Sequence, residues 1–151
     1  ANFLMAYFSQ PAHRENELET TTYQSWIIQI IEDTVYAFNQ EFNKLWNTER
    51  KGILYPKSLF EDQGQSSEHA LKSVLKDIWR DAVSVCGIEM HRRCLSLAHN
   101  ADFESIENIS LRVTLEARNL LMGRELILNN NSIQSVGELS NMALEFNKKD
   151  I

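Results

Sequence analysis

The sequence is poor in the residues that turn a chain, since its 151 residues include five glycines and two prolines. A protein built from many strands needs frequent turns, so this shortage favours helices. No stretch alternates between apolar and polar residues with the period of two that marks a half-buried strand. No internal repeat is present. We therefore expect an all-α protein of about six helices in one domain.

Cysteine and positive charge are also scarce. Cys86 and Cys94 are too few for a disulfide framework and predict reduced thiols in a cytoplasmic protein. There are 15 Lys and Arg against 21 Asp and Glu, which gives a formal net charge of −6. Small basic clusters on an acidic chain do not suit a phosphate backbone, so we expect no nucleic-acid partner. The apolar segment 1–8 is too short to span a bilayer, so we expect no membrane partner. That segment is typical of the middle of a hydrophobic helix that has been cut.

What the sequence does contain is apolar residues at steps of three and four, which predict amphipathic helices. The expected helices lie at residues 2–10, 20–46, 66–87, 88–98, 108–128 and from 135 onward. The run Thr20 to Thr22 could cap the second helix, and Gly87 is expected to end the third. Ser135 and Glu138 have the spacing of a capping box for the last helix.

The adjacent pair Arg92 and Arg93 is the first candidate site. Neighbouring residues on a helix point about a hundred degrees apart, so both can reach one ligand only at a helix edge or end. Their guanidinium groups offer several N–H donors that suit a phosphate or the hydroxyls of a sugar. The alternative is a solvated helix face on which the arginines pair with Glu89.

Four potential metal ligands, Cys86, His91, Cys94 and His99, lie within fourteen residues. On one continuous helix Cys86 and His99 fall near the ends, and no turn glycine folds them back, so the spacing argues against zinc. Buried thiols that act as small hydrophobes are much commoner. We expect no metal site here.

His99 and Asp102 lie in a polar segment between two expected helices. They could form a base with its orienting partner. Side chains that satisfy backbone groups in a turn explain them as well, and we favour that role. The sequence lacks a Gly-rich phosphate loop, a Gly-x-Ser-x-Gly elbow and a His-Glu-x-x-His motif. We therefore expect no catalytic residue in this chain.

Two stretches carry a resemblance to a known family. They are Leu4-Met-Ala-Tyr-Phe-Ser-Gln-Pro-Ala-His13 and Gly87-Ile-Glu-Met-His-Arg-Arg-Cys-Leu-Ser-Leu-Ala-His-Asn-Ala-Asp-Phe-Glu-Ser-Ile-Glu107. Both resemble 5-methylthioribose kinases, and Leu121-Met-Gly-Arg-Glu-Leu126 continues the match. The resemblance runs in order from residue 3 to about 129.

This resemblance implies the helical C-lobe of a protein-kinase-like fold, with residues 1–129 as part of that lobe. Residues 130–151 would be a C-terminal extension of one further helix and a frayed tail. Enzymes of this family transfer the γ-phosphate of ATP to the 1-hydroxyl of 5-methylthioribose in methionine salvage. The family's adjacent arginines, which hold the sugar and the transferred phosphate, match Arg92 and Arg93. The resemblance thus implies that these two residues bind substrate.

The resemblance also implies partners and cofactors. ATP and Mg²⁺ would serve the full-length enzyme, and this chain alone would bind neither. The N-lobe and the catalytic loop would lie before Ala1, so the chain alone is expected to be inactive. The full-length enzyme would be a homodimer. The alternative function is a stand-alone helical interaction or ligand-binding domain without catalytic activity.

Overall fold

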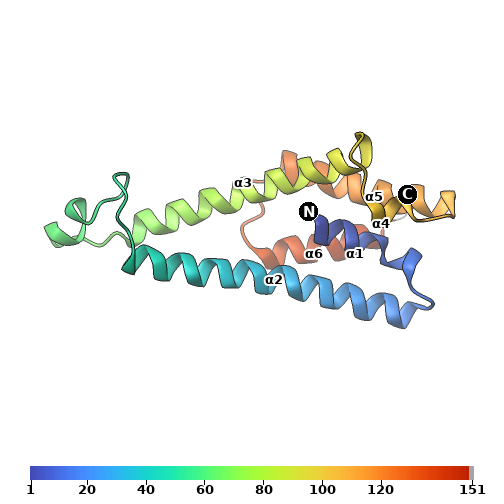
Figure 1. The fold of residues 1–151 in the computed structure, drawn as a ribbon, viewed down its shortest axis with the longest axis horizontal. Helices are drawn as coiled ribbons and strands as arrows, with labels where there is room; N and C mark the ends of the chain where they lie inside the picture. Colours follow the sequence, from blue (N-terminus) through green and yellow to red (C-terminus); the bar gives the residue numbers. More distant parts are fainter. Residues whose placement is uncertain (150–151) are drawn as a thin grey trace.

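The computed structural model describes residues 1–149 and confirms the all-α fold (Figure 1). The described part of the chain holds six α-helices and two short 3-10 helices: α1 (Asn2–His13), α2 (Glu17–Thr48), η1 (Lys57–Leu59), η2 (Glu61–Gln63), α3 (Glu68–Leu95), α4 (Ala101–Glu104), α5 (Ile109–Leu128) and α6 (Val136–Asn147). The last two residues of the expected tail, 150–151, lie outside the described residues. Within residues 1–149, no helix combines the length and the apolar character that a bilayer crossing needs.

The core gathers around α1 and α5. Helix α1 packs against α2 and α5, while α5 also packs against α3 and α6. Helix α1 contains the apolar segment at the start of the sequence. Its residues Leu4, Met5, Tyr7 and Phe8 are buried. The other helices contribute the following buried residues: Ile27, Val83, Met90, Phe103, Leu115, Met122, Leu126, Ala143 and Phe146. Burial of this apolar surface is the main force that holds the helices together.

A proline lies inside α1 without breaking it. Pro11 has no N–H, so the carbonyl of Tyr7 lacks its usual donor one turn later. The side-chain Nε2 of Gln24 in α2 donates to that carbonyl at 3.0 Å and is itself buried. The first helix, expected at residues 2–10, therefore runs three residues further, to His13, and a neighbouring helix supplies the missing donor.

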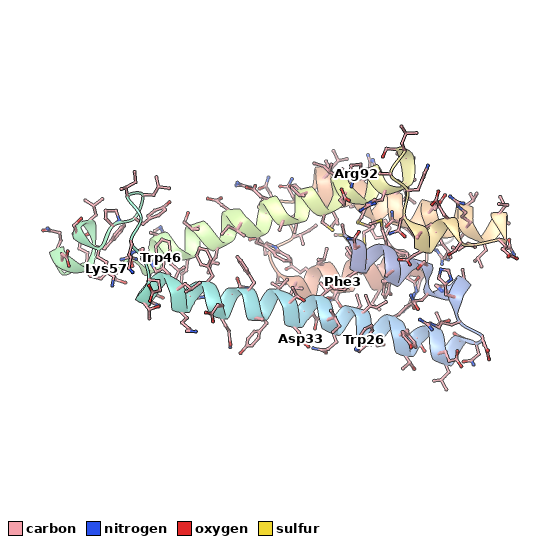
Figure 2. The ribbon with its side chains drawn as sticks, viewed as in Figure 1. Phe3, Trp26, Asp33, Trp46, Lys57 and Arg92 are labelled. Carbon is pink, nitrogen blue, oxygen red and sulfur yellow. The ribbon has the colours of Figure 1, made fainter. Side chains whose placement is uncertain are left out.

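Helices α2 and α3 extend beyond the core as a two-helix arm (Figure 1). At its tip, Trp46 Nε1 donates to Ser67 Oγ at 3.1 Å, and Arg50 Nη1 donates to the same oxygen at 2.5 Å. Arg50 also pairs with Glu61. Apolar residues of α2 are partly exposed: Phe38 is 46% exposed, and Trp26, which lies beside α1 and not in the arm, is 59% exposed (Figure 2).

The start of α2 differs from the expectation. Asn16 is the N-cap, since its side chain accepts from the backbone N–H of Glu19 at 2.9 Å. The threonine hydroxyls bond backward instead, as in Thr22 Oγ1 to the Leu18 carbonyl at 2.7 Å. The Ser135 cap is confirmed, because its Oγ accepts from the Glu138 N–H at 3.2 Å. The Glu138 carboxylate accepts from the backbone N–H of Gln134.

Helix α3 runs without interruption from Glu68 to Leu95, so the two separate helices expected at 66–87 and 88–98 are one. Gly87 does not end a helix because it lies at the crossing with α5. A Cβ placed on Gly87 would meet the Gly123 carbonyl oxygen at 2.4 Å. The missing side chain serves close packing between two helices, and the helical conformation continues through it.

Candidate functional site

The last turn of α3 carries Arg92 and Arg93. Figure 2 shows Arg92 near the end of α3 that faces away from Trp46 and Lys57 at the arm tip. The Arg92 side chain is 45% exposed and the Arg93 side chain is 33% exposed. Helix α3 ends two residues later, at Leu95. The pair thus occupies a helix end, the place where adjacent arginines can both face one ligand.

Both guanidinium groups hydrogen-bond to one carboxylate, that of Glu89. Arg92 Nη2 donates to Glu89 Oε1 at 2.6 Å and Arg92 Nε donates to Oε2 at 2.7 Å. Arg93 Nε donates to Oε1 at 3.0 Å. The hydrogen bond from Arg92 is the largest cause that lowers the pKa of Glu89 to about 2, and the same contact raises the pKa of Arg92. The pairing with Glu89 that the solvated-face alternative expects is therefore present.

The packing of α3 against α5 holds the part of α3 that precedes the two arginines. Gly87 and Gly123 face each other there, and both are buried. His91 Nδ1 lies 2.9 Å from the Gly87 carbonyl, and its ring lies 2.9 Å from where a Cβ on Gly123 would be. Sequence reasoning missed this contact. A glycine inside a helical pattern is the signal that could have revealed it.

The four residues considered as zinc ligands have separate surroundings. Cys86 Sγ lies 3.9 Å from Met90 Sδ, and Cys94 Sγ accepts from Asn119 Nδ2 at 3.2 Å. His99 is exposed in the loop after α3. Burial raises the pKa of the Cys94 thiol to about 11, with a further contribution from the negative charge of Glu116. Nowhere in residues 1–149 do three His, Cys, Asp or Glu side chains gather as a metal site requires.

The loop between α3 and α5 is organised by Asn100. Its side chain caps α4 by accepting from the Asp102 N–H at 2.7 Å. The carbonyl of Asp102 lies 2.6 Å from His13 Nε2, which ties the loop to α1. The backbone role expected for the His99 and Asp102 side chains thus belongs to Asn100, because its short amide reaches the N–H of the second residue of α4.

An apolar hollow of about 680 Å³ lies elsewhere, between α2 and α3. Phe38, Leu75, Ile78 and Trp79 line it, and Val136 lies at its edge near α6. Trp79 Nε1 donates to the Ile133 carbonyl at 2.8 Å, so the indole is fixed against the segment before α6. The lining includes Lys72 and Lys76 but no carboxylate and no histidine. The hollow can bind an apolar group, while guanidinium groups such as those of the arginine pair suit an anion.

Known proteins resemble this chain over most of its length. It is 34% identical over 128 residues to a methylthioribose kinase of Escherichia coli O45:K1 (strain S88 / ExPEC), which aligns 85% of this chain with 30% of that protein. It is 31% identical over 143 residues to methylthioribose kinase 1 of Oryza sativa subsp. japonica, covering 91% of this chain and 32% of the relative. A methylthioribose kinase of Yersinia enterocolitica is 35% identical over 104 residues, 66% of this chain and 25% of that protein.

No protein-family model matches the chain. The curated relatives nevertheless agree with one another in name, and they come from bacteria and a plant. The chain spans about a third or less of the length of each of these relatives. The chain is therefore homologous to the methylthioribose kinase family over about a third of those proteins' length.

Proposed function

We propose that this chain is the C-terminal, helical C-lobe segment of an ATP-dependent methylthioribose kinase of the cytoplasm and that Arg92 and Arg93 contact its substrate. The complete enzyme would phosphorylate 5-methylthioribose at its 1-hydroxyl in methionine salvage, as a homodimer. The observation that carries the proposal is the sequence similarity to curated methylthioribose kinases over 85% of the chain. The arginine pair at the exposed end of α3 supports the placement of the substrate.

The arginines would act by charge. As a phosphoryl group passes from donor to acceptor, negative charge redistributes over its oxygens. Guanidinium donors that are already oriented stabilise that charge without reorganising during the reaction. Glu89 holds the two guanidinium groups, and the packing of α3 on α5 holds the helix that carries them, so the pair is oriented before substrate arrives.

ATP and Mg²⁺ belong to the complete enzyme in this proposal. The described residues do not fit a cation site, since no three carboxylate, imidazole or thiol side chains meet within residues 1–149. We therefore assign to this chain no step that runs through the metal. Its contribution is the wall that holds the sugar and the transferred phosphate.

The second candidate function is a helical interaction domain without catalytic activity. The apolar hollow between α2 and α3 favours it, because surface of this kind suits the apolar side of a protein partner. The kinase and the interaction domain can be told apart by one reaction product. Only the kinase forms a phosphate ester of methylthioribose.

The experiment is a phosphoryl-transfer assay on the full-length protein that contains this segment. With ATP, Mg²⁺ and 5-methylthioribose, ³¹P NMR should show a new phosphate ester on the 1-hydroxyl. The isolated chain is the control: it should form no ester, and calorimetry should detect no micromolar binding of Mg–ATP. An ester-free reaction with the full-length protein would reject the kinase and leave the interaction domain.

A further inference from the structure

The Glu89 carboxylate is shared between two arginines. Among the ion pairs of the described residues, it is the one acidic side chain that pairs with two arginines. Each of the other acidic side chains pairs with a single basic residue, as Glu116 does with Arg112 at 2.9 Å. Glu89 itself is 28% exposed, which makes it less open to solvent than Arg92.

We infer that Glu89 is a positioning residue for the arginine pair. It fixes the orientation of both guanidinium groups and reduces the positive charge that they present to a free anion. This inference rests on the function proposed above, because it requires Arg92 and Arg93 to contact the substrate. It assigns Glu89 a role beyond helix stability.

The orientation follows from which nitrogen atoms the carboxylate occupies. The Glu89 carboxylate accepts hydrogen bonds from Nε and Nη2 of Arg92 and from Nε of Arg93. The Ala98 carbonyl lies 3.5 Å from Arg93 Nη1. Within residues 1–149, Nη1 of Arg92 and Nη2 of Arg93 are left without an acceptor. These two groups leave donors that a phosphate or a sugar hydroxyl can use, and Glu89 sets their direction.

Glu89 also lowers the positive charge of the pair, whatever the orientation of the guanidinium groups. Two guanidinium groups and one carboxylate carry a net charge of about +1, since arginine stays protonated and the pKa of Glu89 lies far below neutrality. A negative charge beside the donors weakens their attraction for any anion. Free phosphate is thereby held less tightly than by two bare arginines. The transferring group can still bind through the oriented N–H groups.

A purely structural role for Glu89 makes a different prediction. Ion pairs three and four residues apart on an exposed helix face stabilise the helix only slightly. Loss of Glu89 should therefore leave the fold intact. If turnover and phosphate affinity nevertheless change, and change in opposite directions, helix stability cannot be the reason.

The test compares Glu89→Gln and Glu89→Ala in the full-length protein. Asp77→Asn is the matched control, because it removes another carboxylate that pairs with an arginine three residues along the same helix, at 3.1 Å. We expect kcat to fall on the order of 10-fold or more for Glu89→Ala, as misplaced catalytic donors lose rate steeply. Glu89→Gln keeps an acceptor oxygen and should recover part of kcat.

Inorganic phosphate supplies the second readout. Both Glu89 variants lose the same negative charge, so phosphate should inhibit each at a concentration several-fold lower than in the unmodified enzyme. Asp77→Asn should change neither kcat nor phosphate inhibition. Unchanged kcat in both Glu89 variants would overturn the inference. So would a lower kcat together with unchanged or weaker phosphate inhibition, because that pattern indicates general damage.

Arg92→Ala and Arg93→Ala, measured in parallel, separate the two proposals. If the arginine variants keep normal turnover, the proposed function of the pair fails, and the role of Glu89 fails with it. If the arginine variants lose turnover while the Glu89 variants do not, the arginines bind substrate and only the positioning role is wrong.

Discussion

Replacing Gly87 with alanine tests whether the crossing of α3 and α5 holds the fold together. The added Cβ would lie 2.4 Å from the Gly123 carbonyl oxygen, 2.9 Å from Ile127 Cγ1 and 3.0 Å from Leu126 Cβ. An ordinary contact between carbon and oxygen is about 3.3 Å. The nearest obstacle is backbone, which cannot rotate away as the end of a side chain can. Helices α3 and α5 must therefore separate by close to 1 Å.

Two opposing effects set the magnitude. Overfilling a well-packed contact costs roughly 1–3 kcal/mol. Alanine regains up to about 1 kcal/mol of helix propensity relative to glycine. The clash is severe, so we expect the free energy of unfolding to fall by about 1–2 kcal/mol. For a chain of this length, each 1 kcal/mol shifts the melting temperature by about 2–4 °C.

The assay is thermal unfolding followed by far-UV circular dichroism, with Gly137→Ala as the control. Gly137 lies in the first turn of α6, and the nearest atom to its added Cβ is Ser135 Oγ at 3.9 Å. This second variant should melt at the same temperature or slightly higher, because alanine favours the helix and meets no obstacle. A tight crossing of α3 and α5 is refuted if the melting temperature of Gly87→Ala equals or exceeds that of the unmodified protein, or if both variants change it by the same amount.

Two further predictions concern a cap and a buried thiol. Asn108 Oδ1 accepts from the Leu111 N–H at 3.1 Å, so Asn108→Ala should cost about 1 kcal/mol in urea unfolding, while Ser110→Ala should cost little. Burial raises the pKa of the Cys94 thiol from 9.0 to about 11, so its alkylation rate in the folded protein should keep rising beyond pH 9 and reach half its maximum near pH 11. The unfolded chain ionises this thiol first, so its contribution to stability is present below pH 9 and is lost between pH 9 and 11. A half-maximal alkylation rate near pH 9 would contradict the burial of Cys94.

The helices could be predicted because their cause is local. Apolar residues at steps of three and four mark α2 and α5 in the sequence, and Ser135 marks the start of α6. Two of the errors lie where a residue far away in the sequence decides the local structure. The sequence predicts that a helix ends at Gly87, but this glycine packs against Gly123 and the helix continues. A proline such as Pro11 usually interrupts a helix, but here Gln24 from another helix supplies the missing donor.

The candidate site was only partly predictable. The residue types and the adjacency of Arg92 and Arg93 indicate an anion site, and Glu89 is within reach on the same helix. The sequence already offered the pairing with Glu89 as an alternative, but it could not show which nitrogen atoms the carboxylate occupies, since that depends on side-chain rotamers. It also could not assign the α4 cap to Asn100 instead of to His99 or Asp102, because all three can reach backbone groups in a turn.

The central claim is that the arginine pair at the end of α3 contacts the substrate of a methylthioribose kinase. The most direct measurement is the steady-state turnover of 5-methylthioribose by Arg92→Ala and Arg93→Ala in the full-length enzyme, with Mg–ATP affinity as the check on folding. Each variant should lose on the order of 3 kcal/mol of transition-state stabilisation, about a hundredfold in rate, and keep its nucleotide affinity. Lysine at either position should restore only part of the rate, since an ammonium lacks the guanidinium fork. Near-normal turnover and substrate affinity in both alanine variants would contradict the claim and leave Arg92 and Arg93 as solvated partners of Glu89.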